Sequence, residues 1–98
     1  MLDLHDNLFD WDRQKNLLNI EKHGISFKEA ATAFLDPNAE LFDDKNHSDD
    51  EDRFILIGMS ERTNLLMVCH CYRQDDEIVR IISARKATRF EEGLYGGD

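Results

Sequence analysis

The second half of the chain contains three apolar runs that are separated by very short polar segments. The runs are RFILIGMS (residues 53–60), LLMVCHCYR (residues 65–73) and IVRIISAR (residues 78–85), and the segments between them are ERTN and QDDE. Parallel strands need a crossover of a dozen or more residues, whereas antiparallel strands can be joined by a tight turn. The spacing therefore predicts three neighbouring antiparallel strands, a β-meander.

The first half carries the signals of two helices. Asp12 has the side chain of an N-cap residue for a helix over residues 13–24, which Gly24 would end. We expect the buried stripe of this helix to consist of Leu17, Ile20 and Leu18. Both ends of the first helix are therefore predicted by local signals alone.

A second helix is predicted over residues 26–37, where Ser26 and Glu29 have the spacing of a capping box. Its apolar residues recur at the spacing of one helical face: Phe27, Ala30, Ala31, Phe34 and Leu35. A second Ser/Thr-x-x-Glu pattern, Thr88 with Glu91, predicts a short C-terminal helix.

Two further segments, LFDWD (residues 8–12) and AELFDD (residues 39–44), are expected to be short strands, the latter at a sheet edge. A chain of 98 residues supports one domain, residues 1–98. The predicted fold class is α+β, with two N-terminal helices packed on an antiparallel β-meander and a short C-terminal helix.

The QDDE turn indicates which residues of the last two strands pair, because the paired residue numbers should sum to 151. The expected pairs include Tyr72 with Val79, His70 with Ile81, Val68 with Ser83 and Leu66 with Arg85. Paired residues share a face of a sheet. The face that we expect the helices to cover carries Leu65, Met67, Cys69, Cys71, Ile78, Ile82 and Ala84. The other face would present His70, Tyr72, Ser83 and Arg85 on an open surface.

Basic side chains gather at the end of the last predicted strand, although the chain has a formal net charge of −9. Residues 80–89 contain Arg80, Arg85, Lys86 and Arg89 and no acid. An acidic surface repels phosphates, so the charge excludes a general nucleic-acid coating function. A guanidinium group can nevertheless bind phosphate oxygens with two parallel hydrogen bonds. We therefore expect a local phosphate site where the open sheet face meets the last helix.

Several other classes of function find no support in the sequence. No apolar run approaches the ~20 residues that span a bilayer, and the N-terminus lacks a signal-peptide pattern, so we expect a cytoplasmic protein without membrane contact. The acidic segment 36–52 lacks the spacing and central glycine of an EF-hand. Cys69 and Cys71 are expected to be reduced thiols, because side chains two apart on a strand suit a disulfide poorly. No metal and no cofactor are predicted.

Three stretches carry a family resemblance: KHGISFKEA, HSDDEDRFILIGMS and RIISARKAT. With their surroundings they resemble the BrnT family of toxins, the toxic halves of bacterial type II toxin–antitoxin pairs, over residues 9–95. The resemblance implies a RelE-like fold and an endoribonuclease activity that inhibits translation. It also implies a partner, the BrnA antitoxin with its ribbon-helix-helix domain, and contact with operator DNA only through that antitoxin.

We hypothesise that RNA is cleaved without a metal ion, with the substrate's own 2′-OH as nucleophile. The reaction requires proton transfer and stabilisation of the charge that develops on the phosphorus oxygens. The predicted catalytic residues are His70 and Tyr72 for proton transfer and Arg85 for charge stabilisation. The predicted RNA-binding residues around them are Arg53, Arg80, Lys86, Arg89 and His47. The alternative is a non-catalytic module that docks a partner protein through the open sheet face.

Overall fold

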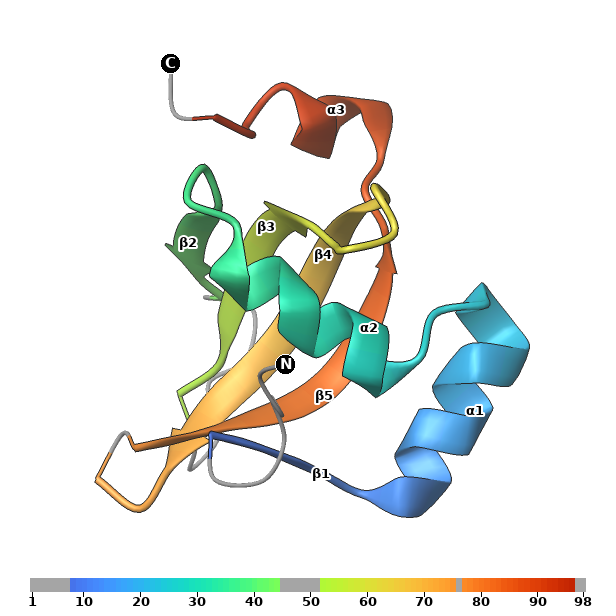
Figure 1. Ribbon diagram of the computed structural model, residues 1–98. Helices are drawn as coiled ribbons and strands as arrows, with labels where there is room; N and C mark the ends of the chain where they lie inside the picture. Colours follow the sequence, from blue (N-terminus) through green and yellow to red (C-terminus); the bar gives the residue numbers. More distant parts are fainter. Residues whose placement is uncertain (1–7, 45–51, 76, 97–98) are drawn as a thin grey trace.

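A mixed five-stranded sheet forms the centre of the molecule, and helices α1 and α2 lie on one of its faces (Figure 1). The computed structural model describes residues 8–44, 52–75 and 77–96. The strand order across the sheet is β1-β5-β4-β3-β2. In chain order the elements are β1 (Phe9–Trp11), α1 (Arg13–His23), α2 (Phe27–Thr32), the 3-10 turn η1 (Ala33–Leu35), β2 (Glu40–Asp43), β3 (Phe54–Met59), β4 (Leu65–Arg73), β5 (Ile78–Lys86) and α3 (Arg89–Glu92).

The predicted meander is confirmed, because β3, β4 and β5 pair in sequence order and antiparallel. Strand β2 pairs antiparallel with β3 at one edge of the sheet, as expected for residues 39–44. At the other edge, however, β1 pairs with β5 in parallel, so the sheet is mixed. A parallel pair is possible here because the helices and three other strands separate β1 from β5 along the chain. The predicted purely antiparallel architecture was therefore incomplete.

The predicted helix starts are confirmed by their capping hydrogen bonds. Asp12 accepts from the backbone N–H groups of Gln14 and Lys15 at 2.8 and 3.1 Å, and Gly24 ends α1 with a left-handed φ of 74°. At α2, the Ser26 hydroxyl accepts from the Glu29 N–H at 3.0 Å. The second helix is shorter than predicted, since its last turn is the 3-10 segment η1. None of the helices in the described ranges is long and apolar enough to cross a membrane.

The expected buried stripe of α1 was wrong. Leu17, Leu18 and Ile20 are 52%, 59% and 40% exposed. The helix instead faces the sheet with a polar side chain, because the buried Asn19 amide donates to the carbonyls of Ile25 and Ala84, both at 2.8 Å. Hydrogen bonds of this side chain, and not aliphatic packing, fix α1 on β5.

The pairing of β4 with β5 follows the expected register only near the turn. Tyr72 pairs with Val79 and His70 with Ile81, as predicted. A β-bulge then follows, because Cys69 pairs with Ser83 and leaves Ile82 as an extra residue on β5. Beyond the bulge every expected pair is wrong by one residue, and the observed pairs are Val68–Ala84, Met67–Arg85 and Leu66–Lys86.

The hydrophobic core lies on the face that α1 and α2 cover, which we call the helix-covered face. Its buried residues are Phe9, Ile25, Phe27, Ala30, Ala31, Ala33, Leu56, Leu66, Val68, Ile81 and Ala84. The face that we predicted to be covered by the helices was therefore the wrong one, and of its expected residues only Ala84 belongs to this core. We call the opposite side of the sheet the open face, because neither α1 nor α2 lies on it (Figure 1).

Candidate functional site

His70 lies in the interior of the molecule. Its side chain is fully buried on the helix-covered face, with ring centroids of Phe34 and Phe54 at 4.8 and 6.1 Å from its own. Its Nδ1 lies 3.2 Å from the carbonyl oxygen of Val68, which can only accept, so Nδ1 carries the proton. Its Nε2, 3.3 Å from the hydroxyl of Tyr72, therefore accepts from that hydroxyl.

Burial also determines the charge of this imidazole. Loss of hydration lowers the pKa of His70 to about 4, against an ordinary value of 6.5, and the hydrogen bond to Val68 offsets only part of that effect. At neutral pH His70 is therefore an uncharged group held between aromatic rings. Its position differs from the exposed proton-transfer role that we expected.

The three side chains that we predicted to be catalytic are not brought together. Tyr72 lies beside His70 on the helix-covered face, whereas Arg85 pairs with Met67 and projects from the open face. The bulge at Ile82 causes this separation, because one extra residue turns every following side chain of β5 to the other face. The expectation that His70, Tyr72 and Arg85 share one face was wrong.

On the open face, Arg85 is held by Glu91 of α3. Its Nη1 and Nη2 each donate to one carboxylate oxygen of Glu91 at 2.8 Å. The same carboxylate accepts from the Thr88 N–H at 2.8 Å, and the Thr88 hydroxyl accepts from the Glu91 N–H, which completes the predicted capping box. The guanidinium side chain remains 32% exposed. Arg85 is therefore fixed in direction and still accessible to a ligand.

The pKa values of the two partners reflect this contact. The hydrogen bond from Arg85 lowers the pKa of the Glu91 carboxyl, although partial burial opposes the change. In return, the hydrogen bond to Glu91 raises the pKa of Arg85. Both groups therefore stay charged at neutral pH.

Two more of the predicted RNA-binding arginines lie on the open face. Arg80 pairs with Cys71 across the β4–β5 ladder and forms an ion pair with Asp10 at 2.6 Å. Arg53 directly precedes Phe54, which pairs with His70 of β4. Continuing this register by one residue places Arg53 beside Cys71, on the side of β4 away from β5. With a strand spacing of about 4.8 Å, the backbones of Arg53 and Arg80 are about 10 Å apart.

Lys86 and Arg89 continue the positive charge beyond Arg85. Both side chains are exposed, one at the end of β5 and the other at the start of α3. The structure thus brings Arg53, Arg80 and Arg85 to one face. Lys86 pairs with the core residue Leu66 and is therefore directed to the helix-covered side, and Arg89 lies on α3. His47, the remaining predicted site residue, lies outside the described residues.

The thiols of Cys69 and Cys71 lie between these arginines and are buried and reduced. Burial raises the pKa of the Cys69 thiol, with a further contribution from Asp44 that the charge of Arg53 partly offsets. Within the described ranges, no group of three or more His, Cys, Asp or Glu side chains could hold a metal ion.

Sequence reasoning missed the two acids that orient the open-face arginines, Asp10 and Glu91. Glu91 was recognised only as a helix cap, and nothing in the local pattern shows that its carboxylate also reaches back to β5. Asp10 is brought to Arg80 by the parallel β1–β5 pairing, which joins residues 70 positions apart. A contact of this range has no signal in local sequence periodicity.

Comparisons with known proteins agree with this architecture. Residues 11–91 match the family model described as the ribonuclease toxin BrnT of type II toxin–antitoxin systems. The crystal structure of the Brucella abortus ribonuclease toxin BrnT is similar in fold, with a TM-score of 0.62 and 24% sequence identity over 84% of this chain and 99% of that one. A search of curated proteins gave no significant match. The match over residues 11–91 shows that the chain belongs to the BrnT family of type II ribonuclease toxins.

Proposed function

We propose that this chain is an endoribonuclease that cleaves RNA at the open face without a metal ion, and that a ribbon-helix-helix antitoxin neutralises it. Family membership supports the ribonuclease activity. The observation that carries the location is the Arg85–Glu91 contact, which holds a partly exposed guanidinium group on the open face.

In the proposed reaction the 2′-oxygen of the substrate attacks the adjacent phosphorus. The bond between phosphorus and the 5′-oxygen breaks, which leaves a 2′,3′-cyclic phosphate and a free 5′-hydroxyl. Water accepts the proton that leaves the 2′-OH, and water donates a proton to the departing 5′-oxygen. The crowded phosphorane carries additional negative charge, and Arg85 is positioned to stabilise it.

The role of Glu91 in this scheme is to orient Arg85. A free arginine side chain loses rotational freedom when it binds a phosphate, whereas Arg85 is already fixed by two hydrogen bonds. Arg80 and Arg53 on the open face, together with Arg89 on α3, would contact neighbouring phosphates, whereas Lys86 is directed to the other side of the sheet. We assign His70 to core packing, because the buried imidazole has no access to a substrate, and Tyr72 to holding its ring through their hydrogen bond.

Cleavage of a purified RNA in the presence of EDTA tests the proposal. Removing one preorganised charge-stabilising group typically costs about 10²–10³ in rate, so Arg85→Gln should slow cleavage by that factor. Arg62→Gln is the matched control, because it removes an exposed arginine from the β3–β4 turn. Glu91→Gln should slow cleavage less than Arg85→Gln, since it loosens the guanidinium without removing it.

Thermal unfolding of each variant shows whether a lost rate reflects lost folding. Equal cleavage by Arg85→Gln and Arg62→Gln, in folded proteins, would refute the role of Arg85. Fragments that appear with Mg²⁺ and vanish with EDTA would refute the metal-free mechanism. Arrest of protein synthesis after induction, measured by labelled amino-acid incorporation, tests the effect on translation.

A non-catalytic docking module is the second candidate, and one observation favours it. Two of the arginines on the open face already have carboxylate partners, Arg80 with Asp10 and Arg85 with Glu91. A module would give no RNA fragments with or without Mg²⁺ and would still form a tight heteromer with its partner. The cleavage assay therefore separates the two functions.

A further inference from the structure

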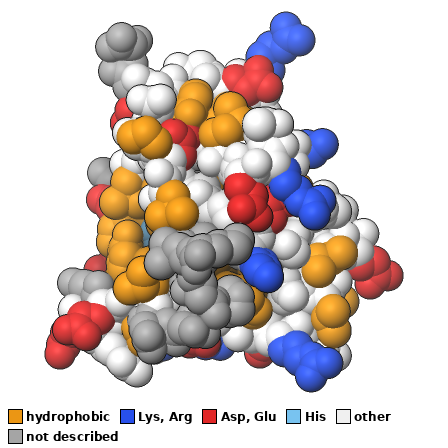
Figure 2. Space-filling model, in the orientation of Figure 1, with side chains coloured by type: hydrophobic (Ala, Val, Ile, Leu, Met, Phe, Trp, Pro, Cys, Tyr) orange, Lys and Arg blue, Asp and Glu red, His pale blue; other side chains and the backbone are white. Residues whose placement is uncertain are grey.

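A second surface of the molecule is locally basic and apolar, on the other side of the sheet from the open face. Residues 13–28 carry four cations, Arg13, Lys15, Lys22 and Lys28, against the single acid Glu21, in a chain whose net charge is −9. Among these cations lie the exposed aliphatic side chains of Leu17, Leu18 and Ile20. In Figure 2 separate hydrophobic side chains lie over α1, with basic side chains and an acidic one near them.

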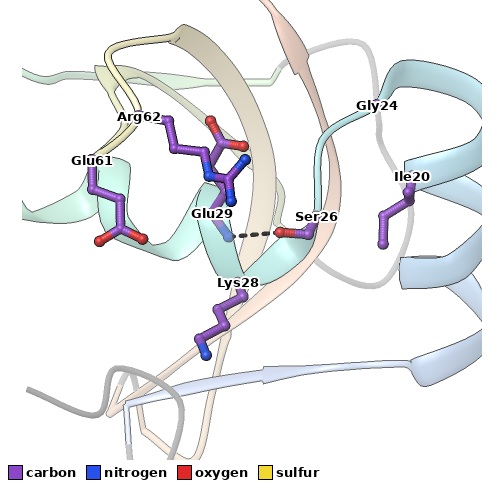
Figure 3. A pocket seen from close by; sticks show the side chains of 7 residues that line it. All are labelled: Ile20, Gly24, Ser26, Lys28, Glu29, Glu61 and Arg62. Atoms are coloured by element: carbon purple, nitrogen blue, oxygen red, sulfur yellow. Dashed lines mark hydrogen bonds between the residues drawn. The ribbon is translucent and has the colours of Figure 1, made fainter.

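A hollow of about 340 Å³ adjoins this helix at its C-terminal end. Ile20 forms an apolar wall, Lys28 of α2 lines the hollow with its side chain directed away from Arg62, and Glu61 and Arg62 extend from the β3–β4 turn (Figure 3). Glu29, at its base, is already engaged, because its carboxylate accepts from Ser60 at 2.7 Å and from Asn64 at 2.8 Å.

The hollow contains two cations, Lys28 and Arg62, and two acids, Glu29 and Glu61. Among the described residues, neither Lys28 nor Arg62 forms an ion pair, in contrast to Arg80 and Arg85 on the open face. An aliphatic stripe beside two such cations is complementary to a segment with apolar side chains on one side and carboxylates at its margin.

We propose that this surface, made of Leu17, Leu18, Ile20, Lys28 and Arg62 and called the α1 surface, docks an acidic amphipathic segment of the antitoxin. The inference rests on the proposed neutralisation by an antitoxin and adds the place and chemistry of the contact. Aliphatic side chains of the segment cover the two leucines and Ile20, and one of its carboxylates enters the hollow between Lys28 and Arg62.

The alternatives fit the surface less well. RNA recognition relies on aromatic stacking and phosphate contacts, and an aliphatic stripe offers no stacking platform. A protein segment can bury the leucines while its carboxylates meet the local cations.

Binding to the purified full-length antitoxin, titrated by calorimetry, tests the proposal. Leu17→Ser/Leu18→Ser should weaken binding by at least about 30-fold, the effect of removing a central apolar contact. Leu35→Ser/Leu41→Ser is the matched control, because those leucines are equally exposed and lie on η1 and β2. It should bind within about 3-fold of wild type.

Lys28→Glu/Arg62→Glu should also weaken binding, and it should flatten the dependence of the dissociation constant on salt concentration. Cleavage of RNA without antitoxin should be unchanged in all these variants, since their side chains lie on the other side of the sheet from Arg85. The cleavage assay thus reports on the proposed function, and the titration reports on the α1 surface.

Equal affinity of the two leucine doubles would overturn the proposal. So would unchanged amide hydrogen exchange over residues 13–23 of the wild-type toxin when the antitoxin binds, a measurement that needs no variant. A Leu17→Ser/Leu18→Ser protein that binds the antitoxin normally but loses affinity for single-stranded RNA or anionic vesicles would assign the surface to those ligands instead.

Discussion

Acidification should destabilise this protein through His70, and the effect can be isolated with one substitution. In the unfolded chain His70 takes up a proton near pH 6.5, whereas in the folded protein burial lowers its pKa to about 4. The unfolded state therefore binds more protons between these values, so the free energy of unfolding falls as the pH is lowered through that window. Above about pH 7 the contribution of His70 is fully present and constant.

The magnitude follows from the two pKa values. Each unit of difference corresponds to 1.36 kcal/mol, so the full loss is about 3 kcal/mol once the pH has fallen below 4. By pH 5 the loss relative to pH 7 is already roughly 2 kcal/mol. For a domain of 98 residues such a loss is a large part of a total stability of about 5–15 kcal/mol.

The assay is urea denaturation of the wild type and of His70→Gln at a series of pH values between 7 and 4.5. Glutamine keeps an amide donor and acceptor near Val68 and Tyr72 but does not titrate. Other acid-sensitive contacts, such as Arg85–Glu91, are present in both proteins and cancel in the difference. The stability of the wild type should therefore fall more steeply than that of the variant, by roughly 2 kcal/mol at pH 5.

The control is His23→Gln, which removes an exposed histidine at the end of α1 and leaves the contacts of His70 in place. Parallel curves for the wild type and His70→Gln would refute the conclusion that His70 is buried in its neutral form. If His70 were catalytic, RNA cleavage by folded His70→Gln would be almost abolished at neutral pH. If His70 has a packing role, the cleavage rate of the folded variant should stay within about 10-fold of that of the wild type.

Two further substitutions test the packing that positions the sheet. Gly58→Ala should lower the free energy of unfolding by about 1–3 kcal/mol, because the added Cβ would lie 2.8 Å from the Ala33 carbonyl oxygen and 3.1 Å from the Ala39 Cβ. Gly93→Ala is the control and should cost less, because its added Cβ has its nearest contact at 3.3 Å. Equal midpoints of urea unfolding for the two variants would contradict this reasoning. Asn19→Ala should lower the free energy of unfolding by about 2–4 kcal/mol, because it removes the side-chain amide that donates to the buried carbonyls of Ile25 and Ala84. Asn38→Ala, at an exposed position, is the control and should leave the free energy of unfolding nearly unchanged.

The sequence was informative where the determinant of structure is local. Asp12 and Gly24 fix the ends of α1, and Thr88 with Glu91 fixes the start of α3, because capping needs only residues within one turn. The boundaries of β4 were correct for a similar reason, since the turns on either side leave little choice.

Features that depend on distant residues were not predictable in this way. Leu17 and Leu18 have the composition of a buried stripe, but the position of α1 is decided by Asn19 and its bond to Ala84, 65 residues away. Glu29 has the spacing of a capping box, yet its carboxylate is directed to Ser60 and Asn64 instead. In both cases a tertiary hydrogen bond outweighs the local pattern.

The bulge at Ile82 connects the error in the fold to the error in the site. Regular alternation along β5 would have placed Arg85 on the same face as His70, and a histidine beside an arginine would have suggested acid–base chemistry. One extra residue moves Ala84 into the core and turns Arg85 to the open face, where it meets Glu91 and lies on the same side as Arg80. The chain can therefore keep His70 neutral and buried while it presents oriented arginine side chains on the opposite face. RNA cleavage at that face would depend on the placement of positive charge and not on the titration of His70.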